Sequence, residues 1–373
     1  MLCRGNKELK LCESAAADFA AKELVPENQA HDAYPFGPFF DPVLEKACKL
    51  EFFHTVLPEE MDGMGQGMTA LCVILEKISE ADASLAGIIF TNALAQKILL
   101  ASGAGGLLQS IVSNARDAKS FLIGCCAFNN PSEVRHVAMV KRKGGGFLLS
   151  GALEYVVLGG LARHVLVPGV MEGEKDFSYF LVETNGPGVK AGPPVFSLGL
   201  HACPAVDIQF TDARGELAGN LGQGAAYLDA ASDEMAVASA AMSLGIMQGA
   251  FKYGRDYARK RFQGGRQIIG WSEVRMMLAN MAAQAKVAQL ALSRACQAVD
   301  DKEARWREAS RATCLWVQEM ACAVATDGIQ VLGGVGYMKD YPQEKRFRDA
   351  KHAQALLGIA PMRKLALLND LMV

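Results

Sequence analysis

The 373-residue sequence has no excess of charge of either sign, because 38 Lys and Arg face 40 Asp and Glu and leave a formal charge of -2. This balance argues against a protein that binds nucleic acid or anionic membranes over its whole length. Long uninterrupted apolar runs are also missing, since Leu85 to Leu100 is broken by Asn92, Gln96 and Lys97. We therefore expect no membrane span. The first residues, MLCRGNKELKLCES, contain no apolar segment typical of a secretory signal.

Motifs for disulfides, metals and nucleotide phosphates are lacking as well. The 10 cysteines show no framework spacing, and the neighbours Cys125 and Cys126 are poorly suited to bridging each other. We therefore expect reduced thiols and a cytoplasmic location. The 6 histidines lie far apart and show no ligand spacing with Cys or Glu, so no metal site is expected. No GxxxxGK[ST] phosphate loop occurs.

What is present is a large apolar fraction, 51% of the residues, against 21% charged residues. A chain of this length and composition is folded and divides into two or three domains. Residues 1–120 are rich in helix-forming residues with helical periodicity. Residues 121–222 contain short β-rich runs separated by Gly, Pro, Asn or Asp, and 223–373 are helical again. The pattern predicts an α+β protein with an N-terminal helical domain, a middle β-domain and a C-terminal helical bundle.

Two local patterns support this division. The segment His136 to Val157 predicts a β-hairpin around the triplet Gly144–Gly146. Three long segments with few helix breakers, Ala230–Arg261, Ser272–Asp300 and Lys302–Ile329, predict helices that pack as an antiparallel bundle.

The segment Ile329 to Lys351, IQVLGGVGYMKDYPQEKRFRDAK, resembles the C-terminal signature of the acyl-CoA dehydrogenase flavoproteins. That family has a Q-x-x-G-G-x-G-Y loop followed by a YP-x-E-x-x-x-RDAK segment. YARKRFQGGRQI, from Tyr257 to Ile268, is similar to the family's Y-A-x-x-R segment. Leu198 to Tyr227 resembles its strand and entry into the bundle, and Leu57 to Met68, LPEEMDGMGQGM, resembles P-E-x-x-G-G-x-G. These matches occur in order along nearly the whole chain.

The resemblance implies the acyl-CoA dehydrogenase fold, ending in a four-helix bundle, with FAD as cofactor and an acyl-CoA thioester of fatty-acid metabolism as substrate. It also implies a homotetramer built as a dimer of dimers, and electron transfer to an electron-transfer flavoprotein. In such a reaction a carboxylate removes the α-proton of the thioester while a hydride leaves the β-carbon for the flavin. The α-proton is weakly acidic, so this carboxylate must face the flavin and be shielded from water.

The matched position of this carboxylate carries leucine in the present sequence. The family's I-Y-E-G-T falls on Ala355 to Ile359, which places Leu357 at the base position. Some relatives carry the base on the first bundle helix, and that position falls on Met235. The neighbouring Glu234 is then the candidate catalytic base, although one helical residue is a rotation of about 100°. As a buried base beside a flavin, Glu234 should have a raised pKa. An ordinary acidic residue near a helix N-terminus is the competing interpretation of this position.

The matched flavin contacts are also changed. Cys126 stands where the family has threonine in its T-E-P-x-x-G-S-D turn, whereas Ser132 keeps the serine. The family's W-I-T falls on Tyr155 to Val157, so an aromatic ring remains but Val157 has no hydroxyl for flavin N5. The resemblance also implies cofactor contacts made across a subunit interface, in which Arg261 would bind the pyrophosphate. The residues of this second set are Arg261, Gln330, Gly333 and Gly334.

Three interpretations stay open at this point. The chain is a working oxidoreductase with a relocated base, or it binds FAD and CoA for other chemistry, or it lacks catalysis. In the third case it acts as a partner subunit in a hetero-oligomer, or as a binding or structural protein. Loss of the base, the N5 hydroxyl and the turn threonine together weakens the first interpretation, because such groups act as a unit.

Overall fold

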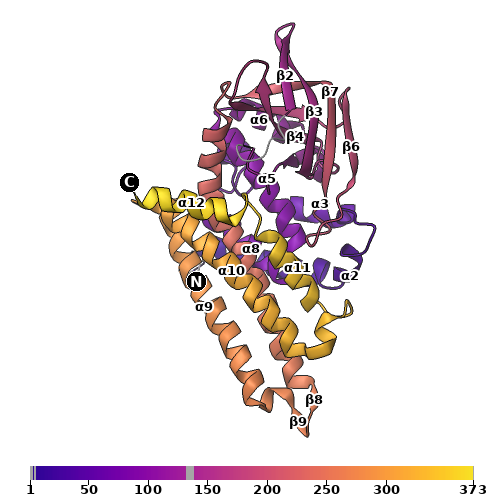
Figure 1. Ribbon diagram of the computed structural model, residues 1–373, viewed down its shortest axis with the longest axis vertical. Coiled ribbons are helices and arrows are strands. Elements are labelled where there is room, and N and C mark those ends of the chain that lie inside the picture. Colours follow the sequence, from indigo (N-terminus) through magenta and orange to yellow (C-terminus); the bar gives the residue numbers. More distant parts are fainter. Residues whose placement is uncertain (1–2, 4–5, 132–137, 373) are drawn as a thin grey trace.

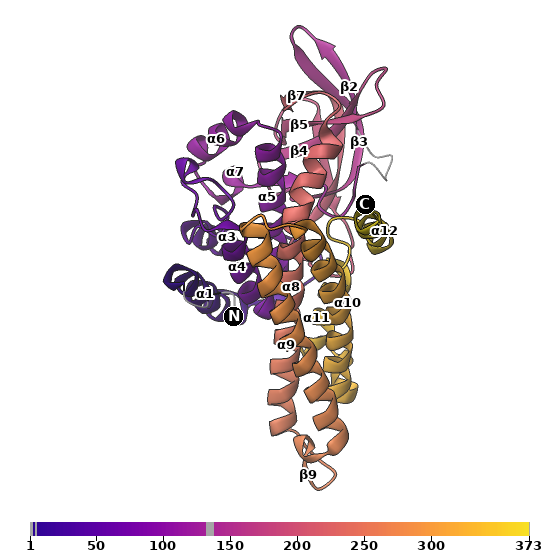
Figure 2. The ribbon, with the colours of Figure 1, turned by 90° about the vertical axis from the view of Figure 1, so that its left-hand side faces the viewer.

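The computed structural model describes Cys3 and residues 6–131 and 138–372, and these form an α+β protein of three parts (Figure 1). A group of N-terminal helices lies beside a β-sheet and the adjoining half of a long helical bundle. Figure 2 shows the sheet at one end of the molecule and the free end of the bundle at the other. The predicted fold class is confirmed.

The N-terminal part is built around two apolar helices that follow each other along the chain. Asp82 ends α4 and caps α5, because its side chain accepts a hydrogen bond of 2.7 Å from Ser84 N. Within the described residues, α5 is the one helix long and apolar enough to cross a membrane. However, 89% of its most apolar 18-residue stretch is buried inside the protein. The elements are α1 (Lys7–Phe19), η1 (Ala20–Leu24), α2 (Asn28–His31), α3 (Asp41–Lys49), η2 (Glu59–Met61), α4 (Gly67–Ala81), α5 (Ala83–Ala101), α6 (Gly105–Asn114) and α7 (Ala118–Phe121).

The middle part is a seven-stranded mixed sheet with the order β1-β3-β2-β4-β5-β7-β6. Additional β1–β4 and β3–β7 pairings fold the sheet back on itself. The predicted hairpin is present, since β2 and β3 are antiparallel and Lys143 pairs with Gly146 across the turn. The strands are β1 (Ile123–Cys125), β2 (Ala138–Lys143), β3 (Gly146–Val157), β4 (His164–Met171), β5 (Phe177–Glu183), β6 (Val189–Pro194) and β7 (Ala205–Ala218).

The C-terminal part is a bundle whose longest helix packs directly on α4. Gly245 and Gly249 make this approach possible, because an added Cβ would lie 2.3 Å from Glu76 O and 2.4 Å from Glu80 O, respectively. A larger residue at either position would force the two helices apart. The elements are α8 (Gly224–Lys260), β8 (Phe262–Gln263), β9 (Arg266–Gln267), η3 (Ile268–Gly270), α9 (Ser272–Asp300), α10 (Trp306–Leu332), η4 (Gly333–Tyr337), α11 (Gln343–Ala353) and α12 (Ala360–Leu371).

The third long helix begins later than the sequence predicts, at Trp306 instead of Lys302. The residues between α9 and α10 make a tight turn in which Lys302 and Arg305 have φ of 48° and 63°. Such left-handed conformations interrupt a helix. Composition alone did not reveal this turn, because it contains no Gly or Pro.

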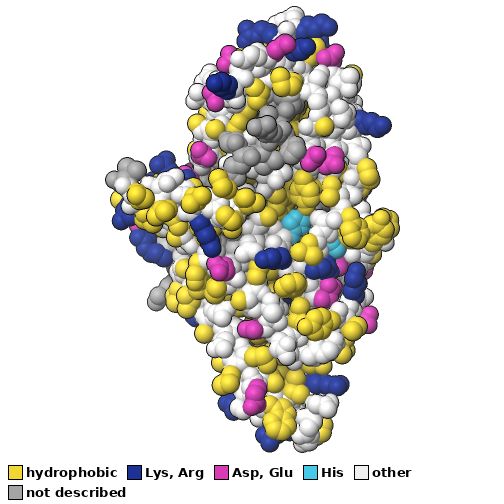
Figure 3. Space-filling view, in the orientation of Figure 1, with side chains coloured by type: hydrophobic (Ala, Val, Ile, Leu, Met, Phe, Trp, Pro, Cys, Tyr) yellow, Lys and Arg dark blue, Asp and Glu magenta, His cyan; other side chains and the backbone are white. Residues whose placement is uncertain are grey.

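The last helix, α12, lies across the bundle and has no buried residue. Figure 3 shows hydrophobic side chains gathered over this helix on one face of the molecule. Among its apolar residues, Met362, Leu365, Leu368 and Leu371 are all exposed. An exposed apolar helix face of this kind marks a surface that favours contact with another molecule.

Candidate functional site

Tyr155 lies at an irregular point of β3, where the strand turns toward the bundle. The β3–β7 register shifts between Leu153 and Val156, and Tyr155 has a φ of 56°. Asp207 holds this conformation, because its Oδ1 accepts a hydrogen bond of 2.9 Å from Tyr155 N. Left-handed backbone at a non-glycine residue is strained and tends to occur where a side chain is aimed at a site.

The Tyr155 hydroxyl is paired with His352, which lies in the last turn of α11. Burial lowers the pKa of His352, so its ring is neutral near pH 7. His352 Nδ1 lies 2.6 Å from Gly199 O and 3.3 Å from Gly199 N, and the shorter contact favours a ring proton on Nδ1. Nε2 is then the acceptor for Tyr155 O–H at 2.7 Å. The pair joins the β-domain to the bundle and uses the tyrosine proton internally.

Side chains of this chain fill the space beside the Tyr155–His352 pair. The Phe128 ring packs 5.7 Å from the Tyr155 ring and 4.7 Å from the His352 ring, measured between centroids, and Phe128 is buried. Leu357 N donates a hydrogen bond of 2.9 Å to Ala127 O, which holds the segment after α11 against the same loop. Val157 is only 1% exposed. The three segments thus close over the strand end that carries Tyr155 and Val157.

Leu357 itself borders a small cavity of about 90 Å³ between α8, α10 and α12. Liquid water occupies about 30 Å³ per molecule, so this space holds only a few waters. Two carboxylates border the cavity, one helical turn apart on α8: Asp229 and Asp233. Arg311 contacts Asp233 at 2.6 Å, but burial outweighs this contact and raises the pKa of Asp233. Burial also raises the pKa of Asp229.

Glu234 points away from this cavity and forms two ion pairs. Its carboxylate lies 2.6 Å from Lys97 Nζ and also contacts Lys302 Nζ. Burial would raise the pKa of Glu234, but the two lysines outweigh burial and lower it. The expected raised pKa is therefore wrong, because the rotation of one residue turns the side chain from the Leu357 side toward Lys97. The catalytic role of Glu234 stays a prediction that this geometry does not favour.

Replacing Glu234 with glutamine is expected to lower the free energy of unfolding by about 1–3 kcal/mol at pH 7, because the partly buried Lys97 and the exposed Lys302 lose their counter-charge. A carboxyl with a lowered folded pKa stabilises the protein above its unfolded pKa, and this contribution is lost as the pH falls. The difference between variant and wild type should therefore shrink below about pH 4.3, the ordinary pKa of glutamate. Urea unfolding at several pH values measures it.

Glu303→Gln is the matched control, because the Glu303–Arg294 pair is exposed and should add little. An equal, pH-independent effect of both variants would show that the Glu234 ion pairs do not stabilise the fold.

The second set of predicted cofactor residues lies at the free end of the bundle. Arg261 follows the last residue of α8, and Gln330 lies in the last turn of α10; both are exposed. The two helices run side by side here, since a Cβ at Gly254 would lie 3.6 Å from Val331 Cγ1. At Gly333 and Gly334 an added Cβ would meet no atom within 4 Å.

The three glycines of the loop after α10 are subject to different structural constraints. Gly333 has a φ of 64° and a ψ of -141°, a backbone conformation essentially restricted to glycine. A Cβ at Gly336 would lie 2.4 Å from Ile329 O, so Gly336 is required by the packing of the loop. Gly334 meets neither condition, and its backbone faces open space. A close approach by a ligand or another chain would explain it.

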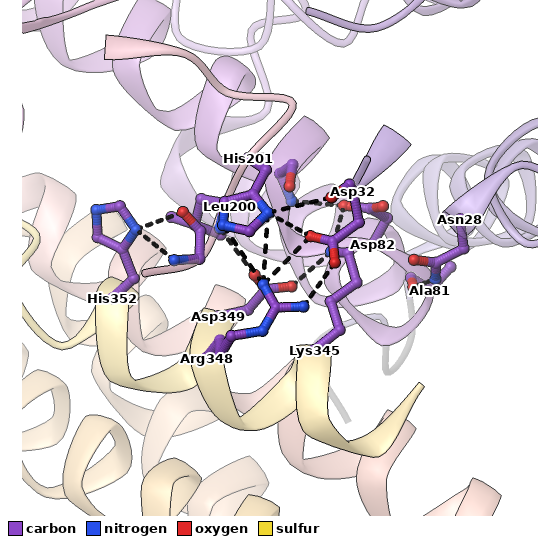
Figure 4. A network of polar contacts seen from close by, with 12 residues as sticks. Asn28, Asp32, Ala81, Asp82, Leu200, His201, Lys345, Arg348, Asp349 and His352 are labelled. Carbon is purple, nitrogen blue, oxygen red and sulfur yellow. Dashed lines mark hydrogen bonds and ion pairs between the residues drawn. The ribbon is translucent and has the colours of Figure 1, made fainter. Parts of the chain in front are cut away.

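The residues of the YP-x-E-x-x-x-RDAK segment make a buried polar network that joins all three parts of the protein (Figure 4). Arg348 binds Asp32 at 2.6 Å, and His201 contacts the same carboxylate at 2.7 Å. Deeper in the protein, Lys345 Nζ lies 2.6 Å from Asp349 and 3.2 Å from Asp82. Burial would lower the pKa of Lys345, but the two carboxylates outweigh burial and raise it. This motif is thus structural, clamping α11 onto the N-terminal helices.

A larger cavity of about 1110 Å³ lies elsewhere, between α1, α8 and α11. Some of its charged side chains are paired with each other, as Lys252 is with Glu80 at 3.0 Å and Lys77 with Glu13 at 3.5 Å. It shares no lining residue with the Leu357 cavity and contains none of the predicted site residues. No cluster of His, Cys, Asp and Glu suited to a metal occurs among the residues that the structure describes.

Comparison with known proteins gives the chain its family. Residues 6–106 match the model of the acyl-CoA dehydrogenase N-terminal domain, and residues 222–366 match that of the acyl-CoA dehydrogenase C-terminal domain. The chain belongs to the acyl-CoA dehydrogenase family. The resemblance of the sequence motifs to this family is thereby confirmed.

Relatives match this acyl-CoA dehydrogenase family member over nearly its full length. Cyclohex-1-ene-1-carbonyl-CoA dehydrogenase of Syntrophus aciditrophicus is 27% identical, covering 95% of the chain and 87% of the relative. Benzylmalonyl-CoA dehydrogenase of Aromatoleum aromaticum is 25% identical and covers 97% of each. Butyryl-CoA dehydrogenase of Megasphaera elsdenii has the same fold, with a TM-score of 0.89 at 19% identity and 99% coverage of both chains.

FAD fits one of the two predicted half-sites but not the other. The bundle end offers the exposed backbone of Gly334 beside the exposed Arg261, groups that suit the phosphates or adenosine of a dinucleotide. The β-domain end is closed. Val157 is buried and has no hydroxyl, and the partly buried Cys126 offers a flavin ring only a thiol, which is a weak hydrogen-bond donor. Ser132 lies outside the described residues.

Several residues of this region were not predicted from the sequence alone. The Tyr155–His352 contact joins positions far apart in the chain, and no local pattern announces it. Asp229 and Asp233 could have been found, because a spacing of four residues places two carboxylates on one helix face. Asp229 and Asp233 line the same cavity as Leu357, the matched base position, whereas Glu234 does not line it.

Proposed function

We propose that this chain is a subunit of an FAD-dependent oxidoreductase of fatty-acid or related acyl-CoA metabolism in the cytoplasm. The enzyme oxidises an acyl-CoA thioester at its α and β carbons and passes electrons to an electron-transfer flavoprotein. Family membership and relatives named as acyl-CoA dehydrogenases support the reaction class. A matching chain solved in work on the electron-transferring flavoprotein of Acidaminococcus fermentans supports the choice of partner.

The observation that carries the role of subunit is the contrast between the two ends of the cofactor site. At the bundle end, Arg261 and Gly334 are exposed, and an added Cβ at Gly334 would meet no atom of this chain within 4 Å. At the other end, the motif resemblance puts Leu357, which cannot accept a proton, at the base position, and the cavity of about 90 Å³ beside it falls far short of the roughly 300 Å³ of a small ligand site. The chain thus has groups that could contact a cofactor held by a neighbouring chain, but it lacks a base and a ligand-sized cavity at its own Leu357 site.

The same small cavity favours a second candidate function, that of a family member without the usual base acting as a binding or structural partner. The two candidates differ in whether assemblies that contain this chain turn over acyl-CoA. In the first, its residues help to hold the cofactor during oxidation. In the second, they only maintain an assembly.

Anaerobic addition of a panel of acyl-CoA thioesters to the purified assembly distinguishes these functions. We expect at least one thioester to bleach the flavin absorbance when this chain is present with a flavin-bearing subunit. Added electron-transfer flavoprotein should restore the absorbance. A flavin that no thioester bleaches would contradict the proposed reaction and favour the binding or structural role.

Assembly itself is expected to depend on the apolar face of α12. We propose a dimer or dimer of dimers, either of identical chains or with a related subunit. The double substitution Leu365→Glu and Leu368→Glu places two charges on this exposed apolar face and should lower the assembled mass in sedimentation at micromolar concentration. Lys364→Glu on the same helix is the control and should leave the mass unchanged. A wild-type monomer would contradict the proposed assembly.

A further inference from the structure

The family relation would lead one to expect two equivalent flavin sites in a pair of identical chains. Each site would combine the β-domain of one chain with the bundle end of the other. In this chain the two contributions differ, since one is closed by its own side chains and the other is open. The following inference rests on the proposed function and asks which chain holds the flavin.

We propose that this chain contributes only the bundle half of a flavin site. It completes a site whose flavin ring is held by the β-domain of a different, related chain. That partner carries the hydroxyl-bearing flavin contacts and the carboxylate base that this chain lacks. Each pair of unlike chains then holds one FAD.

In the β-domain half, four contacts within the chain fill the space beside Tyr155 where a flavin ring would lie. Tyr155 O–H is committed to His352 at 2.7 Å, and the His352 ring is held by Gly199 O at 2.6 Å. Phe128 packs on both rings, and Leu357 N is tied to Ala127 O at 2.9 Å. A flavin ring entering here would have to displace buried apolar side chains and break two short hydrogen bonds, without a hydroxyl at Val157 to receive it.

The bundle half of the site is open, because its candidate cofactor-binding groups are exposed and no part of this chain lies in front of them. The Arg261 guanidinium is exposed, and its contact within the chain is a long one of 3.5 Å to Gln263 Oε1. The backbone at Gly333 and Gly334 faces space free of protein atoms within 4 Å of an added Cβ. The Gly333 N–H donates to Gln330 O, so the exposed guanidinium and the exposed backbone at Gly334 are the groups left to meet a dinucleotide diphosphate. Packing within the chain does not explain Gly334.

A second copy of this chain cannot supply the missing half, because it carries the same Val157, the same Tyr155–His352 pair and the same Leu357. The two halves also cannot meet within one chain. Tyr155 lies in the sheet, and Arg261 lies next to β8 at the opposite end of the bundle (Figures 1 and 2). The occupant of the open half is therefore an FAD molecule held by an unlike subunit.

Flavin retention by defined preparations tests this proposal. The purified chain, titrated with FAD and followed by flavin fluorescence, is expected to bind none at micromolar concentration. The chain is then co-expressed, with a tag on it alone, with each related chain of the same genome that has Thr at the positions of Cys126 and Val157 and Glu at that of Leu357. At least one complex should copurify with one FAD per pair of chains.

The Arg261→Ala variant of that complex should retain FAD about tenfold more weakly or worse, with unchanged sedimentation. Arg259→Ala is the matched control, since Arg259 is an exposed arginine in the last turn of the same helix. Retention unaffected by Arg261→Ala would remove this chain's bundle end from the site.

The remaining outcomes also decide between the claims. One tightly bound FAD per chain in the protein purified alone would overturn the shared half-site and leave the proposed function intact. Failure of every such related chain to form a complex would overturn it as well. A complex with the expected flavin content that no acyl-CoA reduces would instead contradict the proposed function.

Discussion

Asp349→Ala is expected to lower the free energy of unfolding by about 3–5 kcal/mol, because it breaks a buried ion pair by removing one partner. Asp349 and Lys345 are only 3% and 6% exposed, and their charged atoms lie 2.6 Å apart. Asp349 also accepts a hydrogen bond of 2.8 Å from Leu200 N, which would be left unpaired in the core. Asp82, at 3.2 Å, would remain as the close counter-charge of Lys345.

Urea unfolding followed by circular dichroism measures this effect, with Lys351→Ala as the control on the exposed side of the same helix. The double variant Lys345→Met with Asp349→Leu should not recover the loss, because the fully buried Asp82 then loses Lys345 as its counter-charge and Leu200 N stays unpaired. If Asp349→Ala unfolds at the same urea concentration as Lys351→Ala, the network does not hold α11 to the N-terminal helices.

Gly334→Val should reduce FAD retention by the assembled complex about tenfold or more while leaving the fold intact. The added side chain meets nothing in this chain, so any effect comes from what approaches from outside. Gly336→Val is the matched contrast. Its Cβ would lie 2.4 Å from Ile329 O, so it should destabilise the loop by about 1–3 kcal/mol through overpacking.

Thermal unfolding and flavin content, measured on both variants, separate the two effects. A Gly334→Val complex with full flavin content would mean that the open space before Gly334 is not used by the cofactor. Equal loss of thermal stability in both variants would mean that Gly334 is required by the loop itself.

The sequence predicted the helical and β segments well because each follows a local rule. Apolar periodicity marks the long helices, and the triplet Gly144–Gly146 marks the turn of the hairpin, where Lys143 pairs with Gly146. The late start of α10 escaped prediction because Lys302 and Arg305 adopt left-handed conformations without Gly or Pro to signal them. Local sequence rules therefore predict the helices and strands, but not every residue at which they begin or end.

The candidate site was predicted less well, because its character depends on contacts between distant segments. Leu357 was expected at the base position, but only the structure shows that the space beside it is small. Glu234 was one position from the expected place in sequence, yet that rotation directs its side chain to Lys97. Likewise, Tyr155 was predicted as an aromatic flavin contact, which stays a prediction, and its bond to His352 required the fold.

The RDAK segment shows a related limit. It helped to identify the family, and in the structure Arg348 and Asp349 hold elements together through Asp32, Leu200 and Lys345. A motif specific enough to reveal a family can therefore be a structural clamp. The positions that the family resemblance links to the reaction are instead those of Cys126, Val157 and Leu357, where this chain differs from the family's motifs.

The most direct test of the shared flavin site is a cryo-electron-microscopy map of this chain in complex with its flavin-bearing partner. The account predicts flavin density in the β-domain of the partner, with the diphosphate or adenosine end against Arg261 and Gly334 of this chain. It predicts no cofactor density between Tyr155, Phe128 and Leu357. Flavin density in that closed position, with the Tyr155–His352 hydrogen bond broken, would contradict the account.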